Sequence, residues 1–267
     1  MARVRVGRLL LPWALFVAGV LSVSLAGPGE SSAEEMTTTS SAVSTSSPGT
    51  STPPASTTVP ASTTTVRSTT TTTIVRLRDV RVIKRVRTNK RVVFITIDDG
   101  GYISPSLVRY LNRERIPITS FVMPGPLQWQ WYKMRNIRLM RYGDHSNTHA
   151  HLRRLTLWGQ KVEICWGKRL VQRITHKKVV LFRPPGGDYN ADTLRAMAHC
   201  GIRYLILWNA IADHQLIRMR SSHKLMPGDI ILMHYKSDLE HSLRHVMAQL
   251  KHDGLRPAFL NDYLKYG

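Results

Sequence analysis

The sequence predicts an α/β fold built on a parallel sheet or barrel, and three observations lead to that prediction. From Ile74 onward, apolar runs of strand length alternate with segments whose apolar residues recur at helical spacing. The run "RVVFITID", residues 91–98, is almost continuously apolar, which is typical of a strand buried on both faces of a parallel sheet. Ionisable residues follow the expected strands, at the edge where such folds gather their chemistry.

The first half of the folded part opens with loosely alternating apolar and basic residues. "IVRLRDVRVIKRV", residues 74–86, predicts an edge strand with a solvated basic face. After the strand at 91–98, Ser104 is a candidate N-cap for a helix over residues 104–116. "PITSFVM", residues 117–123, predicts a second buried strand, and "PLQWQWYKM", residues 126–134, is expected in the loop that follows it.

The second half continues the alternation of helices and strands. Helices are expected over residues 157–174, 190–201 and 239–254, the second of them ending at Gly201. Strands are expected at "KKVVLF" (177–182), "IRYLILW" (202–208) and "PGDIILMHY" (227–235). This order is typical of parallel strands joined by helical crossovers.

Charge and cysteine content limit the possible partners. The chain holds 38 lysines and arginines against 17 acidic residues, a net charge of +21. This surplus indicates an anionic neighbour, such as a membrane or a charged cell-wall polymer, and no motif points to nucleic acid. Two cysteines, Cys165 and Cys200, are too few for a four-cysteine zinc site; they form either one disulfide or two separate buried thiols.

The N-terminal third is expected to lie outside the folded domain. Residues 1–26 combine a basic start, an apolar run and a small-residue cleavage pattern, which predicts a signal peptide or an uncleaved signal-anchor. Residues 27–73 are dominated by Ser, Thr, Pro and Ala, a composition that predicts a disordered linker. Residues 74–267 are therefore the expected catalytic domain. This domain is expected to be secreted, or held at the cell wall or membrane outside the cell. The membrane is expected as a partner only through an uncleaved N-terminal segment.

Polar residues at strand ends suggest a metal site. Asp98 and Asp99 close the strand at 91–98, while Arg183, Asp213 and His234 follow later strands. His145 and His149 are spaced i, i+4, which lets two imidazoles reach one metal, and His151 is interpreted as a non-ligand. Together with Asp99 they give two histidines and one carboxylate, the composition of a catalytic zinc site or of a non-haem iron site.

Four motifs together resemble the polysaccharide deacetylases, also called NodB-homology proteins or carbohydrate esterase family 4. "TIDDG" resembles the family's TFDDG, "HSNTH" its H-[ST]-x-x-H, "RPPGG" its R-P-P-Y-G and "GDIILMH" its L-x-H strand. They occur in the family's order, and the likeness runs from about Val80 to Gly267. The resemblance implies a distorted (β/α) barrel, commonly of seven strands.

The resemblance also implies a role for each site residue. Asp99, His145 and His149 would hold one divalent metal, with zinc expected first and Co, Mn, Ni or Fe as alternatives. Asp98 would be the general base, kept in place and ionised by Arg183, and His234 the general acid. The remaining two positions are the backbone N–H near Gly186, which would bind the oxyanion, and Asp213, which would support His234.

Several positions depart from the family pattern, mostly around the substrate groove. Ile97 and Ala150 replace the usual Phe and Pro, and Gly186 replaces a Tyr that would wall the groove. The stretch "NAIADH", residues 209–214, lacks the family's Asp-Trp pair. Trp129, Trp131 and Tyr132 either stack on sugar rings or pack on the barrel. These changes bear on substrate and rate more than on the metal site.

The leading functional hypothesis is an exported, metal-dependent hydrolase that removes acetyl groups from an N-acetylated polysaccharide, such as peptidoglycan or a chitin-like polymer. An O-acetyl esterase of the xylan type is the alternative within the same chemistry. A non-catalytic wall-binding module is the alternative from another class, although it would not need a base and an acid. A non-haem iron oxygenase fits the ligand set but not a parallel barrel. A monomer is expected.

Overall fold

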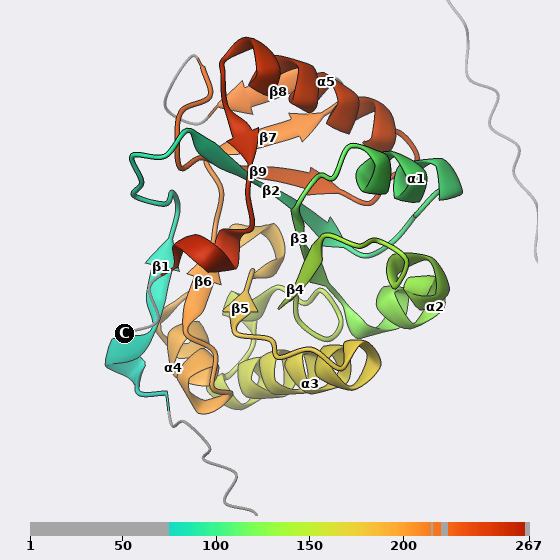
Figure 1. The fold of residues 1–267 in the computed structure, drawn as a ribbon. Helices are drawn as coiled ribbons and strands as arrows, with labels where there is room; N and C mark the ends of the chain where they lie inside the picture. The colour runs from blue at the N-terminus through green and yellow to red at the C-terminus, as the bar shows by residue number, and fades with distance from the viewer. Residues whose placement is uncertain (1–74, 215, 220–223, 265–267) are drawn as a thin grey trace, which may run out of the picture. The chain divides into compact units, whose positions relative to one another are not determined.

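The computed structural model describes residues 75–214, 216–219 and 224–264, and this part of the chain folds around one curled sheet (Figure 1). The expected signal or anchor at 1–26 and the expected linker at 27–73 lie outside the described residues. Within the described ranges, none of the helices has the length and apolar character needed to cross a membrane.

The sheet has the strand order β1-β6-β5-β4-β3-β2-β9-β7-β8, and β10 pairs with β2 beside this path. Neighbouring strands run parallel except for the antiparallel pair β7 and β8. The strands are β1 (Arg81–Ile83), β2 (Val92–Asp99), β3 (Ile118–Val122), β4 (Met140–Asp144), β5 (Leu181–Phe182), β6 (Tyr204–Ile206), β7 (Ala210–Asp213), β8 (Leu216–Met219), β9 (Ile230–His234) and β10 (Arg256–Pro257).

This architecture confirms the predicted distorted barrel of parallel strands and helices, but the strand number differs. The described sheet has ten strands where the resemblance implied seven. The additional strands include the antiparallel β8 and the two-residue β10, which pairs with β2 beside the main strand order. The basic stretch predicted at 74–86 does supply an edge strand, although only its residues 81–83 pair with the sheet.

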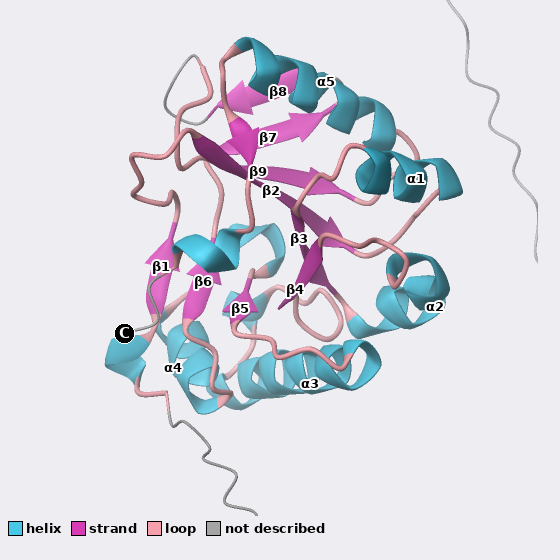
Figure 2. Ribbon diagram, viewed as in Figure 1, coloured by secondary structure: helices cyan, strands magenta, loops and turns pink. Residues whose placement is uncertain are grey.

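The helices lie around the outside of the curled sheet (Figure 2). Three have side-chain caps in which Ser104, Thr156 and Asn190 accept from backbone N–H groups of the first turn, as N-caps do. Ser104 therefore has the capping role that the sequence predicts. The helices are α1 (Pro105–Arg113), α2 (Pro124–Met134), α3 (Leu157–Thr175), α4 (Ala191–His199) and α5 (Leu239–His252).

Residues 126–134 form most of helix α2 rather than the predicted loop. Pro124 starts the helix, where its missing N–H costs nothing. Leu127 and Met134 are buried at helical spacing and Trp131 packs against the same core, so burial of this face outweighs the loop-like composition. Trp129 is 80% exposed and Tyr132 also faces solvent. Trp131 thus follows the packing interpretation, whereas the other two remain outside the core.

Strand β2 divides its side chains between two cores. Val93, Ile95 and Ile97 belong to the core shared with α1, α2 and α5, whereas Val92 and Phe94 belong to the core on the other face. Successive side chains of a strand alternate between faces, so Thr96 and Asp98 follow Phe94 into the interior of the curl. This alternation places a hydroxyl and a carboxylate inside the curl.

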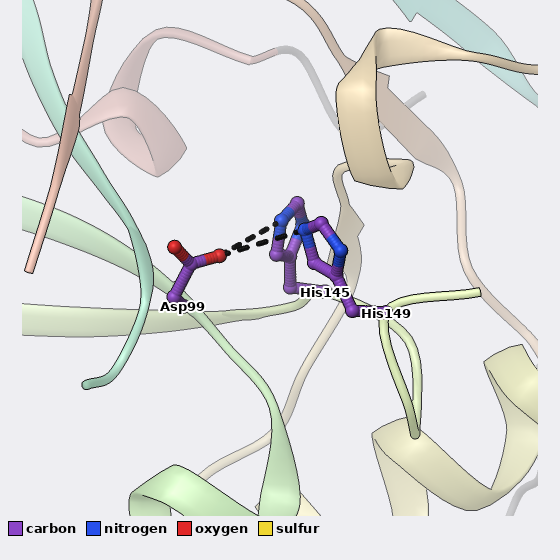
Figure 3. A group of neighbouring side chains, drawn as sticks. All are labelled: Asp99, His145 and His149. Atoms are coloured by element: carbon purple, nitrogen blue, oxygen red, sulfur yellow. Dashed lines mark ion pairs between the residues drawn. The ribbon is translucent and has the colours of Figure 1, made fainter. Parts of the chain in front are cut away.

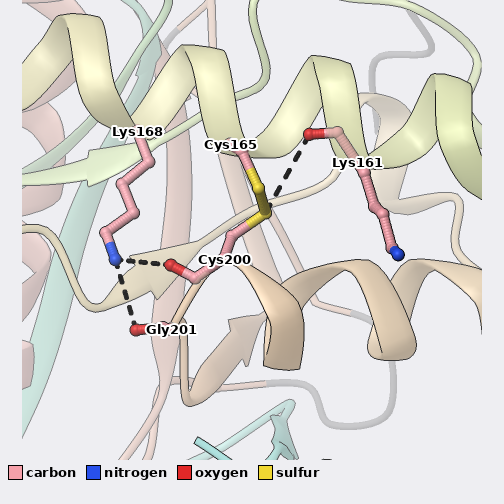
Figure 4. The surroundings of a disulfide bond; sticks show 5 residues. All are labelled: Lys161, Cys165, Lys168, Cys200 and Gly201. Atoms are coloured by element: carbon pink, nitrogen blue, oxygen red, sulfur yellow. Dashed lines mark hydrogen bonds between the residues drawn. A yellow bond between two sulfur atoms is a disulfide. The ribbon is translucent and has the colours of Figure 1, made fainter. Parts of the chain in front are cut away.

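The two cysteines form a disulfide that ties α3 to the end of α4 (Figure 4). The Cα atoms of Cys165 and Cys200 lie 5.1 Å apart. Lys168, one turn further along α3, donates from Nζ to the carbonyl oxygens of Cys200 at 2.6 Å and Gly201 at 3.4 Å. Of the two alternatives left by the sequence, the disulfide is the one observed, and it fixes α3 against its neighbour.

Candidate metal centre and catalytic residues

The candidate residues meet at the carboxyl ends of four strands. Asp98 is the penultimate residue of β2 and lies in register with His234, the last residue of the adjacent strand β9. His145 directly follows β4, and Arg183 directly follows β5. Because these strands are parallel, their ends share one rim of the sheet, as the sequence predicts.

Asp99, His145 and His149 form a three-residue group with metal-ligand character (Figure 3). The Nε2 atoms of His145 and His149 lie 3.5 and 3.7 Å from Asp99 Oδ1. That oxygen is buried and has no hydrogen-bond partner, which is costly unless a cation or proton is shared there. Ligand atoms about 2 Å from a tetrahedral zinc ion lie roughly 3.3 Å apart, so the observed spacing fits a divalent metal.

His145 is prepared as a neutral ligand. Its Nδ1 lies 2.8 Å from the carbonyl oxygen of Arg183, so Nδ1–H donates there and the Nε2 lone pair faces Asp99. Burial lowers the pKa of the imidazole, while Asp98, the Arg183 carbonyl and Asp99 act in the opposite direction. The deprotonated form is the one a metal requires.

The residues around the metal group adopt an unusual backbone conformation. Asp99, Ser146 and His149 have φ values of 79°, 68° and 64°, a region in which side-chain-bearing residues are uncommon. The His149 N–H donates to Ser146 Oγ at 3.0 Å, which closes a tight loop. The spacing of the two histidines is therefore realised on this loop and not on a helix. Strain of this kind persists only where surrounding contacts hold it, and it concentrates at functional sites.

Asp98 and Arg183 form a fully buried ion pair next to the metal group. Arg183 Nη1 donates to Asp98 Oδ1 at 2.7 Å and to Thr96 Oγ1 at 2.8 Å. Its other nitrogens reach the carbonyls of Ile206 and Leu207, and its guanidinium carbon lies 4.3 Å from the Phe121 ring centroid. Burial lowers the pKa of the guanidinium and Asp98 opposes this effect. Since Asp98 Oδ1 binds the arginine, Oδ2 remains directed towards the site, 3.8 Å from His145 Nε2.

The remaining predicted residues occupy the rim around this centre. His234 is half-buried at the end of β9, and Gly186 is exposed with a φ of 64°. A Cβ added at Gly186 would meet no atom within 4 Å, so there is open space where the family usually has a Tyr. Asp213 forms ion pairs with Lys236 and His214, each at 3.6 Å, and within the described chain no bond joins it to His234.

Sequence reasoning did not anticipate three polar residues behind the site. Thr96 is a hydrogen-bond partner of Arg183, and its position two residues before Asp98 in a strand was the available signal. Glu163 binds the loop that carries His149, and Asp144 is buried with neither carboxyl oxygen hydrogen-bonded. In the sequence, Glu163 is a lone acid within a helical pattern and Asp144 is an acid before a histidine. Neither pattern indicates these contacts.

Comparison with known proteins agrees with this site. Residues 85–205 match the polysaccharide deacetylase family. An uncharacterized protein of Streptomyces coelicolor is 34% identical over 192 residues, covering 68% of this chain and 77% of the relative. A peptidoglycan-N-acetylglucosamine deacetylase of Bacillus cereus is 24% identical over 203 residues, covering 68% of this chain and 92% of the relative.

The fold is also that of solved family members. A mutant with restored activity of a carbohydrate esterase family 4 pseudoenzyme from Bacillus anthracis superposes with a TM-score of 0.61 at 23% identity, over 69% of this chain and 71% of the other. The chain belongs to the polysaccharide deacetylase family. Its homologues indicate a hydrolase of N-acetyl amide bonds.

Proposed function

We propose that this protein is an exported, metal-dependent deacetylase that removes acetyl groups from an N-acetylated polysaccharide, either peptidoglycan or a chitin-like polymer. One observation carries the proposal. His145 and His149 face the buried Oδ1 of Asp99, which has no hydrogen-bond partner, and this group lies beside the buried Asp98–Arg183 ion pair. A protein that only binds a polymer has no use for this costly arrangement.

Asp99, His145 and His149 would hold one divalent ion, and zinc is our first choice because two imidazoles and a carboxylate suit it. When bound, the metal supplies a Lewis acid that lowers the pKa of water and polarises the acetyl carbonyl. Asp98 then takes a proton from the attacking water with Oδ2, the oxygen not bonded to Arg183. Arg183 keeps the base oriented and balances its charge.

The other rim residues complete the hydrolysis. The water oxygen adds to the carbonyl carbon, and the Gly186 backbone N–H donates to the developing oxyanion. His234 donates a proton to the sugar nitrogen as the carbon–nitrogen bond breaks, which leaves a free amine and acetate. Asp213 would support His234 through charge rather than direct contact, because its ion pairs run to Lys236 and His214.

Export is supported by the N-terminal sequence pattern and by the disulfide. Disulfides such as Cys165–Cys200 persist mainly in oxidising compartments outside the cytoplasm. The net charge of +21 would hold the enzyme close to an anionic wall polymer. We therefore expect binding to isolated cell walls to weaken as salt is raised. Binding that is equal at low and high salt would refute this part of the proposal.

The direct test is acetate release from N-acetylglucosamine oligomers, peptidoglycan and acetylated xylan, with added Zn²⁺ or Co²⁺. Wild type should release acetate from one or both N-acetylated substrates, and Asp98→Asn should be slower by roughly 10²–10⁴-fold. Release from xylan alone would indicate the O-acetyl esterase instead. If metal-loaded wild type is inactive on all three substrates, the non-catalytic wall-binding module is the remaining hypothesis. If Asp98→Asn releases acetate as fast as wild type, the assignment of Asp98 as the base is wrong.

A further inference from the structure

Helix α3 contacts the loop between the two histidines of the metal group through one buried carboxylate. Glu163 is 8% exposed and lies in the middle of the helix. Its Oε2 accepts from the backbone N–H groups of Asn147 at 3.1 Å and Thr148 at 2.9 Å. Its Oε1 accepts from Thr148 Oγ1 at 2.9 Å. Both residues lie between the two histidines of the metal group, so Glu163 holds the connecting loop from behind.

The helix packs on this loop with little free space. Gly167 lies one turn after Glu163 on the same face of α3. A Cβ at Gly167 would come within 2.4 Å of Asp144 Oδ1 and 2.8 Å of the Ser146 carbonyl carbon. Only a glycine therefore allows the helix to approach closely enough for the Glu163 carboxylate to reach two backbone N–H groups.

The loop needs such support because of its backbone conformation. Ser146 and His149 flank the two anchored residues and both have positive φ. His149 is 48% exposed, so burial alone does not fix its imidazole as it fixes that of His145. The backbone of His149 is held by its own bond to Ser146 Oγ and by the three bonds that Asn147 and Thr148 donate to Glu163. Its ring also lies edge-on to that of His145, with 5.1 Å between the ring centroids.

We infer that Glu163 is a positioning residue for the metal centre: it sets the loop geometry that brings His149 Nε2 towards Asp99 and His145. This inference rests on the proposed metal-dependent function. Outer partners that orient a metal ligand commonly change metal affinity by about 10–100-fold when removed. Glu163 orients its ligand through the backbone of the loop instead of through the imidazole.

The same helix offers a matched control. Gln160 is also buried on α3 and also makes three hydrogen bonds, to Leu155, Asn190 and Thr193. Two of these bonds join α3 to the start of α4, and the third reaches Leu155, just before α3. None of them touches the loop between the histidines. Gln160→Ala should therefore destabilise the fold as Glu163→Ala does, without the effect on the metal.

The experiment measures Co²⁺ and Zn²⁺ binding to the metal-free full-length protein by calorimetry and by the cobalt absorption spectrum. Glu163→Ala should weaken binding by about 10–100-fold and alter the cobalt spectrum. Glu163→Gln should stay within about threefold of wild type, because its amide oxygen can accept the two N–H bonds. Glu163→Asp keeps the charge but is shorter, so it should bind more weakly than Glu163→Gln. Gln160→Ala should match wild type.

The outcomes separate this inference from the proposed function. If wild type binds metal and Glu163→Ala binds it equally well with the same spectrum, Glu163 has no positioning role, and the metal-dependent function stands. If Glu163→Ala does not fold, the metal affinities of Glu163→Gln and Glu163→Asp test the inference instead. Tighter metal binding by Glu163→Asp than by Glu163→Gln would overturn it. A wild type that binds neither ion would overturn the metal site together with the inference.

Discussion

Two groups of metal-type side chains lie at strand ends of this sheet, and they differ in how they are held. One group lies at the end of β2 and after β4 and consists of Asp99, His145 and His149. The other lies at the end of β7 and before α5 and consists of Asp213, His214 and Asp238. Each group has ligand atoms within 4.8 Å of one another, and each includes a histidine with positive φ. By proximity alone the two groups would be equivalent.

Their surroundings distinguish them. In the Asp213 group, His214 is 71% exposed and its two ring nitrogens face the carboxylates of Asp238 at 3.0 Å and Asp213 at 3.6 Å. One carboxyl oxygen that faces a histidine lacks a hydrogen bond in each group, Asp99 Oδ1 in the first and Asp238 Oδ2 in the second. The second group differs because Lys236 already pairs with Asp213. In the first group His145 is buried and has its second ring nitrogen fixed by a carbonyl. Burial and an anchored ligand, more than closeness, indicate a metal site.

The largest difference should appear when one cation is removed from beside each group. Arg183→Met leaves the Asp98 carboxylate buried without its partner and should cost about 3–5 kcal/mol of unfolding free energy. Lys236→Met removes an exposed partner of Asp213 and should cost less than about 1 kcal/mol. Urea unfolding of both variants measures the two losses. Similar small losses would show that the buried pair is not held as tightly as its geometry indicates.

Metal affinity should separate the two histidines with positive φ. His149→Ala removes a proposed ligand and should weaken Zn²⁺ or Co²⁺ binding by at least about 100-fold, more than loss of an outer partner usually does. His214→Ala removes a histidine already paired with two acids and should leave affinity within about threefold. Calorimetry on the metal-free proteins measures both. Equal losses would mean that the two groups bind metal alike.

Stability of the metal-free protein should depend on pH through Asp144, which directly precedes His145. Burial raises the pKa of this carboxyl well above its usual range; Glu163 adds to the effect, and Ser146 and Lys168 oppose it. The folded state therefore keeps a proton that the unfolded chain loses above about pH 4. The resulting stability is complete below that pH and is lost as pH rises towards the folded-state pKa.

Asp144→Asn tests this directly because the amide cannot ionise. The unfolding free energy of the variant should increase relative to that of wild type as pH rises above about 4. Urea titrations at several pH values, with a chelator present, give the difference at each pH. A difference that does not change with pH would show that Asp144 titrates alike in both states.

The sequence predicted strands β1, β2, β3, β5, β6 and β9 and helices α1, α3, α4 and α5, because burial leaves local patterns. Strand-end chemistry pointed to the three proposed metal ligands. The sequence did not reveal β4, whose residues 140–144 include Arg141, Gly143 and Asp144. That strand forms because it completes the sheet between β3 and β5, and Gly143 leaves room for the Phe121 ring, which a Cβ would approach to 2.4 Å. Helix α2 and the contacts of Glu163 were missed for the same reason: tertiary packing determines them.

The smallest effect is expected at Asp213, whose role most needs testing. The family resemblance assigns it to support of His234, yet its ion pairs run to Lys236 and His214. Asp213→Asn should change the rate of acetate release by less than about tenfold, because an exposed pair contributes about 1 kcal/mol or less. Rates of the variant and wild type across pH 5–9 provide the measurement. A loss of more than about tenfold would mean that Asp213 supports His234 across a longer distance. A smaller loss would leave Asp213 as a partner of Lys236 and His214 alone.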